Sequence, residues 1–233
     1  MIEAKNINFH YRHNKNDFMI NDVSIEIKPG YMTCLLGSNG AGKTTLMSLI
    51  YGILNPESGN IYYEGKPVDK KTQQAFHRDV AYFGEKWCAN NLKVNENVEM
   101  LSLLYPSFEK ELFDKYMVLA QANDISDKKF GILSTGEKAK VETAFLLART
   151  PKFIILDEPL ANIDPVFKTD ILQILQRSVA DNGTGVLIST HLLDEISEMV
   201  DYIYVMKNGQ IVKQGDRFEL LGDEDGSLKS ILL

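Results

Sequence analysis

Cysteine is scarce in this sequence, and long apolar segments are missing. Only Cys34 and Cys88 occur among the 233 residues, and neither belongs to a spaced cysteine motif. This scarcity argues for a reducing compartment and against a disulfide framework or a zinc site. No run approaches the roughly 18 apolar residues of a membrane span, and the first residues, MIEAKNINFHYR, carry charges where a signal peptide needs an apolar core. We therefore expect a soluble chain whose role at a membrane, if it has one, depends on a partner.

Positive charge is also in short supply. Lys and Arg total 25 against 32 for Asp and Glu, so the net charge is −7. A nucleic-acid-binding protein that relies on a general basic surface is disfavoured by this balance, and we expect no nucleic-acid partner.

The order of apolar and amphipathic segments predicts alternating strands and helices. The apolar runs near residues 35, 154 and 186 indicate buried parallel strands, whereas residues 1–30 alternate as an antiparallel sheet does. The predicted strands are 32–37, 59–65, 79–84, 152–157, 185–190, 202–206 and 210–215, and the predicted helices are 43–53, 95–104, 109–121, 134–149, 165–181 and 192–199. The expected fold is α/β in one domain, 1–233, with a helix-rich lobe at about 86–150 inserted into the core.

The segment GSNGAGKTT fits the pattern G-x-x-x-x-G-K-[ST] and stands between a predicted strand and a predicted helix. Glycines allow consecutive backbone N–H groups to face one anion, and the helix N-terminus adds partial positive charge. Lys43 is expected to reach the β- and γ-phosphates and Thr44 to bind Mg²⁺. The alternative is a merely flexible glycine loop. The predicted phosphate-binding residues are Gly37, Ser38, Asn39, Gly40, Ala41, Gly42, Lys43, Thr44 and Thr45.

The segment FIILDEP places two acids after a buried strand, at the end where α/β sheets bind ligands. Asp157 is expected to act on Mg²⁺, and Glu158 to orient and polarise the attacking water. The alternative is that both acids simply end the strand at the surface.

A third segment, LSTGEKAKVETAFLLARTPK, opens a helix that ends shortly before the Asp157 strand. Together these motifs resemble the ATP-binding subunits of bacterial ABC transporters, most closely the exporters of drugs, peptides or lipids, over essentially the whole chain. The resemblance implies a P-loop NTPase core with an N-terminal antiparallel β subdomain and an inserted helical subdomain. It also assigns γ-phosphate contacts to His191, Ser134 and Gly136, adenine stacking to Tyr11, and the D-loop to Asp164. Core packing is the alternative for Tyr11.

Two positions depart from the family pattern. Glu85 stands where the family usually has Gln, and its carboxylate can still bind Mg²⁺ or hold a water molecule. Thr135 and Glu137 replace the first Gly and the Gln of the signature LSGGQ, and Glu137 brings a negative charge near the place expected for a partner's triphosphate.

The resemblance implies a head-to-tail dimer, with ATP held between one chain's Lys43 loop and the other chain's signature helix. The second chain is expected to be an identical copy or a related ATPase. The resemblance further implies that separate transmembrane subunits carry the cargo, by export, and hold this chain at the cytoplasmic face of the cell membrane. Trp87, Leu92 and Val94 are candidates for the membrane-subunit socket, with core packing as the alternative.

Two other classes of function were weighed. A non-transport ATPase of the same type would need a coiled-coil insertion or a second cassette, and a GTPase would need a base-specific N-K-x-D-like element. The sequence shows no long coiled-coil insertion and no second cassette, and no N-K-x-D-like element is visible in the region where a GTPase carries it.

Overall fold

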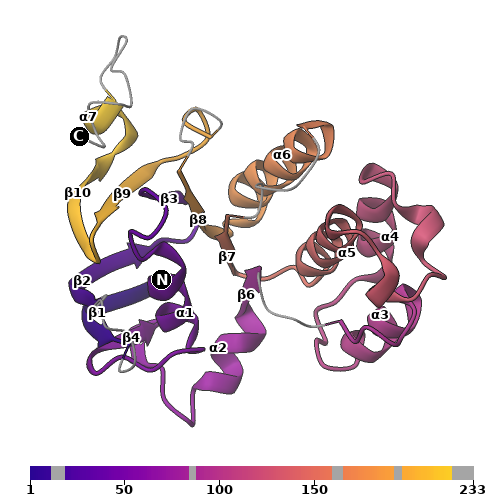
Figure 1. The fold of residues 1–233 in the computed structure, drawn as a ribbon, viewed down its shortest axis with the longest axis horizontal. Coiled ribbons are helices and arrows are strands. Elements are labelled where there is room, and N and C mark those ends of the chain that lie inside the picture. The colour runs from indigo at the N-terminus through magenta and orange to yellow at the C-terminus, as the bar shows by residue number, and fades with distance from the viewer. Residues whose placement is uncertain (12–18, 84–87, 159–164, 192–195, 222–233) are drawn as a thin grey trace.

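The computed structural model describes residues 1–11, 19–83, 88–158, 165–191 and 196–221. A six-stranded sheet runs through the centre of the molecule, with an antiparallel sheet on one side and helices on the other (Figure 1). The strands are β1 (Ile2–His10), β2 (Met19–Ile27), β3 (Met32–Leu36), β4 (Ser58–Tyr63), β5 (Lys66–Pro67), β6 (Val80–Phe83), β7 (Phe153–Asp157), β8 (Gly185–Thr190), β9 (Tyr202–Lys207) and β10 (Gln210–Asp216). The α-helices are α1 (Lys43–Tyr51), α2 (Gln73–Asp79), α3 (Val94–Ser102), α4 (Lys110–Leu119), α5 (Thr135–Ala148), α6 (Pro165–Asn182) and α7 (Arg217–Leu221), and Asn123–Ile125 and Phe130–Ile132 are short 3-10 helices.

The large sheet has the strand order β10-β9-β3-β8-β7-β6, in which β10 alone pairs antiparallel. Strands β3, β7 and β8 are nearly continuous buried runs because helices or the second sheet cover both of their faces. The predicted parallel core is therefore confirmed. Since parallel strands end at one edge, the residues after β3, β7 and β8 lie close together there.

Two hydrophobic clusters pack on the opposite faces of the parallel sheet. Cys34 and Ile154 belong to the cluster that contains residues of α3, α4, α5 and α6, whereas Leu35 and Ile155 belong to the cluster that contains residues of α1, β1 and β2. This division follows from the two-residue period of a strand. Burial raises the pKa of the Cys34 thiol to about 12, and neither cysteine forms a disulfide.

The second sheet is antiparallel, with the order β2-β1-β4-β5. It confirms the antiparallel sheet expected within residues 1–30. The strand predicted at 59–65 belongs to this sheet as β4.

Helices α3, α4 and α5 lie together at the end of the molecule away from β1 and β2 (Figure 1). All three fall between β6 and β7 in the chain, as the helix-rich insertion predicts. The expected apolar socket is wrong for Val94, which is fully buried in the core at the start of α3 because its side chain packs inward. Leu92 is half-buried, and Trp87 lies outside the described residues.

Some predicted boundaries differ from the structure. Helix α2 was not predicted, because its seven residues, QQAFHRD, carry little apolar periodicity. Of the helix predicted at 192–199, residues 196–199 form a turn and the preceding four are not described. Helix α6 starts at Pro165 as predicted, and the residue before it, Asp164, lies outside the described residues. None of the helices that the structure describes is long and apolar enough to cross a membrane.

Candidate functional site

The loop between β3 and α1, residues 37–45 with the first turn of α1, is called the Walker loop here. A Cβ atom on Gly37 would lie 2.6 Å from the carbonyl oxygen of Met206 in β9, so a larger residue would push β3 and β9 apart. Gly42 adopts φ 110°, in the left-handed region, and forms the N-cap of α1 without a side-chain hydrogen bond. Both glycines are therefore required by close approach or by backbone geometry, which argues against the merely flexible loop.

Lys43 is the first residue of α1, and its side chain turns back over the loop. Its Nζ donates hydrogen bonds to the carbonyl oxygens of Gly37, at 2.8 Å, and Ser38, at 3.2 Å. The same Nζ lies 3.2 Å from Oε1 of Glu158, and only 5% of the Lys43 side chain is exposed. A lysine ammonium has three protons, so these three contacts use all its donors.

Asp157 and Glu158 follow β7 and are held by one residue of β8. Ser189 pairs with Asp157 in the parallel register, and its hydroxyl donates to Asp157 Oδ1 at 2.7 Å. The Ser189 oxygen in turn accepts the backbone N–H of Glu158 at 2.9 Å. Glu158 itself has φ 43°, an uncommon conformation for a residue with a side chain, and this conformation turns its carboxylate off the strand line. Such strain costs on the order of 1–3 kcal/mol and is typical of functional sites.

His191 follows β8 directly. Its Nδ1 lies 3.6 Å from Oε1 of Glu158, the same oxygen that faces Lys43. Glu158 therefore stands between a lysine from the Walker loop and a histidine from the end of β8.

These residues open onto a cleft of about 450 Å³, called the Walker cleft here. Tyr11, 39% exposed, forms one wall, with its hydroxyl 3.4 Å from Thr45 Oγ1 and its ring edge-on to Phe9. The lining residues are Tyr11, Asn39, Gly40, Gly42, Lys43, Thr44, Thr45 and Glu158. The exposed ring and the exposed Thr44 hydroxyl are available to a bound molecule.

Ser134 caps helix α5 through a reciprocal pair of hydrogen bonds with Glu137. The Ser134 hydroxyl accepts the backbone N–H of Glu137 at 3.2 Å, and a Glu137 carboxylate oxygen accepts the backbone N–H of Ser134 at 2.8 Å. Hydrogen bonds to Ser134 and the ammonium of Lys128, 3.6 Å away, lower the pKa of the Glu137 carboxyl. The acidic residue in the signature segment is thus a capping residue with a basic neighbour.

Lys43, Glu158 and Tyr11 line the Walker cleft, and Asp157 precedes Glu158 at the end of β7. His191 lies beside Glu158 but is not among the lining residues. Ser134 and Gly136 stand at the start of α5 and are not among the residues that line this cleft. Glu85 and Asp164 lie outside the described residues.

Ser189 was missed by the sequence reasoning, although it stands two residues before His191. Its only sequence signal was its place at the end of a predicted parallel strand, where functional residues gather.

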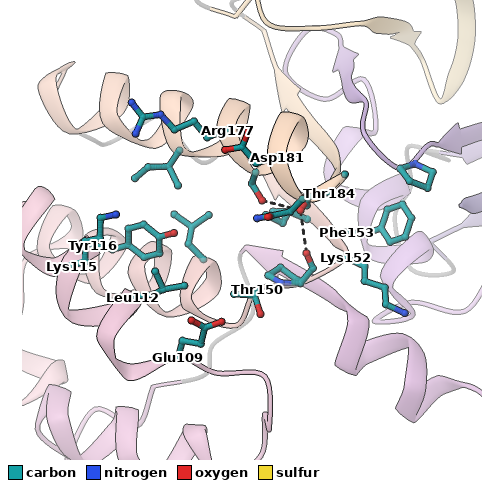
Figure 2. A pocket seen from close by; sticks show the side chains of 18 of the residues that line it. Glu109, Leu112, Lys115, Tyr116, Thr150, Lys152, Phe153, Arg177, Asp181 and Thr184 are labelled. Atoms are coloured by element: carbon teal, nitrogen blue, oxygen red, sulfur yellow. Dashed lines mark hydrogen bonds between the residues drawn. The ribbon is translucent and has the colours of Figure 1, made fainter.

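A larger cavity, of about 770 Å³, lies near the other end of β7 (Figure 2). Figure 2 shows Lys115 and Tyr116 of α4 across from Arg177 and Asp181 of α6. The Thr184 hydroxyl beside them accepts from Ser178 and donates to the carbonyl oxygen of Pro151. The charged residues that line the cavity balance, with Glu64, Glu109 and Asp181 against Lys115, Lys152 and Arg177. No Walker-loop residue lines this cavity, so it does not offer the phosphate-binding geometry of the Walker cleft.

A G-x-x-x-x-G-K-T loop after β3, with two acids at the end of β7 and β8 between the two strands, is typical of P-loop ATPases. The family model described as ABC transporter matches residues 20–161, more than half of the chain. The chain belongs to the ABC transporter family, as an ATP-binding subunit with ATPase activity.

The relatives agree with this assignment. The chain is 31% identical to the lipopolysaccharide export system ATP-binding protein LptB of Haemophilus influenzae, over 96% of this chain and 94% of the relative. It is 32% identical to the energy-coupling factor transporter ATP-binding protein EcfA of Methanocaldococcus jannaschii, over 100% of this chain and 85% of the relative. A solved ATP-binding cassette, MJ0796, in a dimeric post-hydrolysis state with ADP and Pi, shares the fold with a TM-score of 0.80 at 23% identity, over 93% of this chain and 99% of that chain.

Proposed function

We propose that this chain is one half of a head-to-tail ATPase dimer that drives transport through separate membrane subunits. The observation that carries the proposal is the position of Glu158, with one carboxylate oxygen 3.2 Å from Lys43 and 3.6 Å from His191 at the Walker cleft. In this arrangement Lys43 would be the cation that binds phosphate, Glu158 the base, and His191 a second group that can donate a proton.

The Walker cleft is proposed to hold ATP along its length. Backbone N–H groups of residues 37–45 and the N-terminus of α1 would bind the phosphates, and the exposed face of Tyr11 would stack on adenine. Mg²⁺ in proteins commonly takes one or two protein ligands together with phosphate oxygens. The exposed Thr44 hydroxyl and the Asp157 carboxylate, fixed by Ser189, fit that requirement, with Glu85 as a further candidate ligand. The ion would neutralise charge that develops on the phosphates.

Lys43 has to exchange a partner when a phosphate arrives, because its three donors are already used. The Glu158 carboxylate is the partner most readily released, because its side chain is 34% exposed and water can replace Lys43 there, whereas the carbonyls of Gly37 and Ser38 are fixed in the loop backbone. Once released from Lys43, the carboxylate can accept a proton from a water molecule in line with the γ-phosphate. ATP binding and the freeing of the base are thus proposed to be one event.

His191 is proposed to contact the γ-phosphate from the end of β8. Its ring already lies beside Glu158, so it can donate a hydrogen bond to a phosphate oxygen while Glu158 holds the water. Lys43, Glu158 and His191 are the proposed catalytic residues.

The second half of each site is proposed to come from another copy of the chain. Ser134, exposed at the start of α5, and the Gly136 backbone would meet the partner's γ-phosphate, while Asp164 would act at the dimer contact. The dimeric state of MJ0796, a protein of the same fold, supports this arrangement. Every residue assigned to hydrolysis is present in this chain, which favours an identical partner over a related ATPase.

Transport is proposed to take place through membrane subunits on separate chains, with this chain at the cytoplasmic face of the membrane as a single domain, 1–233, whose helical lobe covers about 86–150. We propose export as the direction. The name of LptB states export of lipopolysaccharide, whereas the name of EcfA states no direction.

The head-to-tail arrangement can be tested by crosslinking two different variants. Asn39 and Thr135 are both exposed and adjoin the two halves of the proposed site. A chain with Asn39→Cys mixed with a chain with Thr135→Cys should crosslink only between the two variants and only with ATP. Native Cys34 is buried and Cys88 half-buried, so background reaction should be low. Crosslinking that is independent of ATP, or equally strong within each variant alone, would contradict the composite site.

A second experiment tests transport. Affinity purification of the tagged chain from detergent-solubilised membranes should retain a polytopic membrane protein. Recovery of soluble proteins alone would favour a non-transport ATPase of the same family.

A further inference from the structure

The C-terminal ends of α1 and α5 are connected through α2. Tyr51 ends α1 and Arg149 follows the last residue of α5 as its C-cap. His77, in the last turn of α2, lies between them. Its ring Nε2 donates to the carbonyl oxygen of Tyr51 at 2.9 Å, and its own carbonyl oxygen accepts from Nη2 of Arg149 at 2.9 Å.

Arg149 is fully buried, which is unusual for a guanidinium group. The guanidinium carbon lies 3.6 Å from the ring centroid of Tyr105, in the segment between α3 and α4. The carbonyl of Arg149 accepts a hydrogen bond from the Ser107 hydroxyl at 2.7 Å. Burying a charge costs several kcal/mol before compensation, and an apolar side chain of the same volume would avoid that cost. An apolar side chain, however, could neither donate the hydrogen bond to the His77 carbonyl of α2 nor stack a planar cation on the Tyr105 ring.

The α1 side of the connection is a stack of rings. The His77 ring lies 4.6 Å from that of Tyr51 at an interplanar angle of 25°, and the Tyr51 ring lies 5.1 Å from that of Tyr82 in β6 at 20°. Tyr51 is 3% exposed and Tyr82 is 4% exposed, so these rings are enclosed by the core. Close-packed groups of this kind move together rather than deform.

In the proposed dimer, α1 and α5 of one chain contact two different ATP molecules. The N-terminus of α1 belongs to the chain's own Walker cleft, and the N-terminus of α5, with Ser134, faces the partner's nucleotide. We propose that Arg149 is a positioning residue that fixes α5 relative to α1 and thereby couples the two ATP sites of the dimer. This inference rests on the proposed function above.

Binding of the first ATP is proposed to strengthen the binding of the second. The first ATP to bind fixes α1, and through Tyr51, His77 and Arg149 it also fixes the α5 that the other site needs. The second ATP then meets a helix that is already ordered and binds more tightly, which is positive cooperativity.

The test is the ATP dependence of hydrolysis by the purified chain and by two variants, Arg149→Lys and Tyr105→Leu. Lysine keeps the charge but loses the planar stack, and leucine removes the ring on which the guanidinium rests. We expect a sigmoidal curve for the wild type. In both variants the Hill coefficient should fall toward one and the half-saturating ATP concentration should rise about fivefold or more. The maximal rate should be retained, because no residue proposed to contact ATP is changed.

Lys110→Met is the matched control. Lys110 also places a cation over an aromatic ring of the helical lobe, that of Phe113 at 5.4 Å, but its side chain is 52% exposed and ion-paired with Asp114 on the same helix. Its removal should leave the Hill coefficient and half-saturation unchanged. A melting curve on every variant shows whether the preparation is folded. If only one of the two test variants folds, that variant alone tests the proposal.

Three results would overturn the proposal: a hyperbolic wild-type curve, folded variants with wild-type Hill coefficients, or a lower maximal rate with cooperativity intact. A separate experiment shows whether the proposed dimer itself is wrong. In that case Glu158→Gln would remain monomeric with ATP in sedimentation.

Discussion

Nζ of Lys43 and Oε1 of Glu158 lie 3.2 Å apart, so the phosphate-binding lysine and the proposed base neutralise one another in this structure. The pair joins the Walker loop after β3 to the acidic end of β7, with β8 between these two strands in the sheet, and phosphate binding by Lys43 is a proposed role. Any group that binds one member therefore affects the other, and both can be examined by substitution.

Glu158→Gln should abolish turnover without weakening ATP binding. The amide cannot accept the proton of water, and loss of a general base commonly costs about 10²–10⁴-fold in rate. Because the amide also leaves Lys43 free of its ion pair, ATP should bind as tightly as in the wild type or more tightly. ATP titration with turnover assays, and gel filtration with and without ATP, should show a slow chain trapped as a dimer. Equal hydrolysis rates for variant and wild type would remove Glu158 from the mechanism.

Lys43→Ala should weaken ATP binding and also loosen the Walker loop. The side chain is buried and donates to the carbonyls of Gly37 and Ser38, so its loss leaves two acceptors without their partner. We expect ATP affinity to fall at least about 100-fold, since hydrogen bonds to charged groups contribute roughly 1.5–3 kcal/mol each. Unfolding should also become easier by about 1–3 kcal/mol. Lys138→Ala, on α5, is the control for nonspecific loss of a lysine, and unchanged nucleotide affinity in Lys43→Ala would contradict the phosphate-binding role.

Ser189→Ala should impair hydrolysis although Ser189 has no assigned contact with ATP. The hydroxyl donates to Asp157 and accepts from the Glu158 backbone, so alanine frees both acids from their fixed positions. We expect a loss of about 10–100-fold in rate, in the range found for residues that orient a metal ligand, and a higher Mg²⁺ requirement. Ser178→Ala is the matched control, because that hydroxyl donates to Thr184 near the other cavity, away from the Walker cleft. A wild-type rate and Mg²⁺ dependence in Ser189→Ala would show that the β7–β8 pairing alone positions the acids.

Apolar runs lead into the Lys43 loop and into Asp157 and Glu158, and the family resemblance supplied His191. In the structure Lys43 and His191 both lie beside Glu158, because parallel strands end at one edge of the sheet, while the roles of these residues stay predictions. The sequence did not predict Ser189, since the role of that hydroxyl depends on the register between β7 and β8, which the local pattern of neither strand determines. Val94 was misjudged for a related reason. An apolar residue at the start of a helix is equally compatible with core packing and with surface contact until the helix is placed. The role of Arg149 was invisible, because it depends on α2, a helix too short and polar to predict.

Glu142 on α5 should make the protein less stable as the pH rises through neutrality. Burial raises the pKa of its carboxyl to about 7, against a smaller opposing effect of Lys138. The folded chain then binds more protons at Glu142 than the unfolded chain between about pH 4.5 and 7, so stability falls with rising pH over that interval. Glu142→Gln should therefore melt at a higher temperature than the wild type at pH 8 and at the same temperature near pH 4.5. A difference of equal size at both pH values would assign the effect to packing rather than to ionisation.

The last prediction concerns the acidic residue of the signature segment, which the sequence alone presents as a repulsive charge beside a partner's triphosphate. In the structure the Glu137 carboxylate bonds to the Ser134 backbone and lies 3.6 Å from Nζ of Lys128, so its charge is largely balanced locally. Glu137→Gln should keep the cap, because glutamine also serves in a capping box, and should change ATP-driven dimerisation little. Lys128→Met should weaken the dimer, because the Glu137 carboxylate, no longer balanced by the ammonium, repels the partner's phosphates. The double variant Glu137→Gln with Lys128→Met should then recover most of that loss, as coupled residues do in a double-mutant cycle. Sedimentation of the four forms in the Glu158→Gln background, with ATP, measures each dimer affinity. If Lys128→Met weakens the dimer equally with and without Glu137, the lysine acts on the partner's nucleotide directly and the balancing role is wrong.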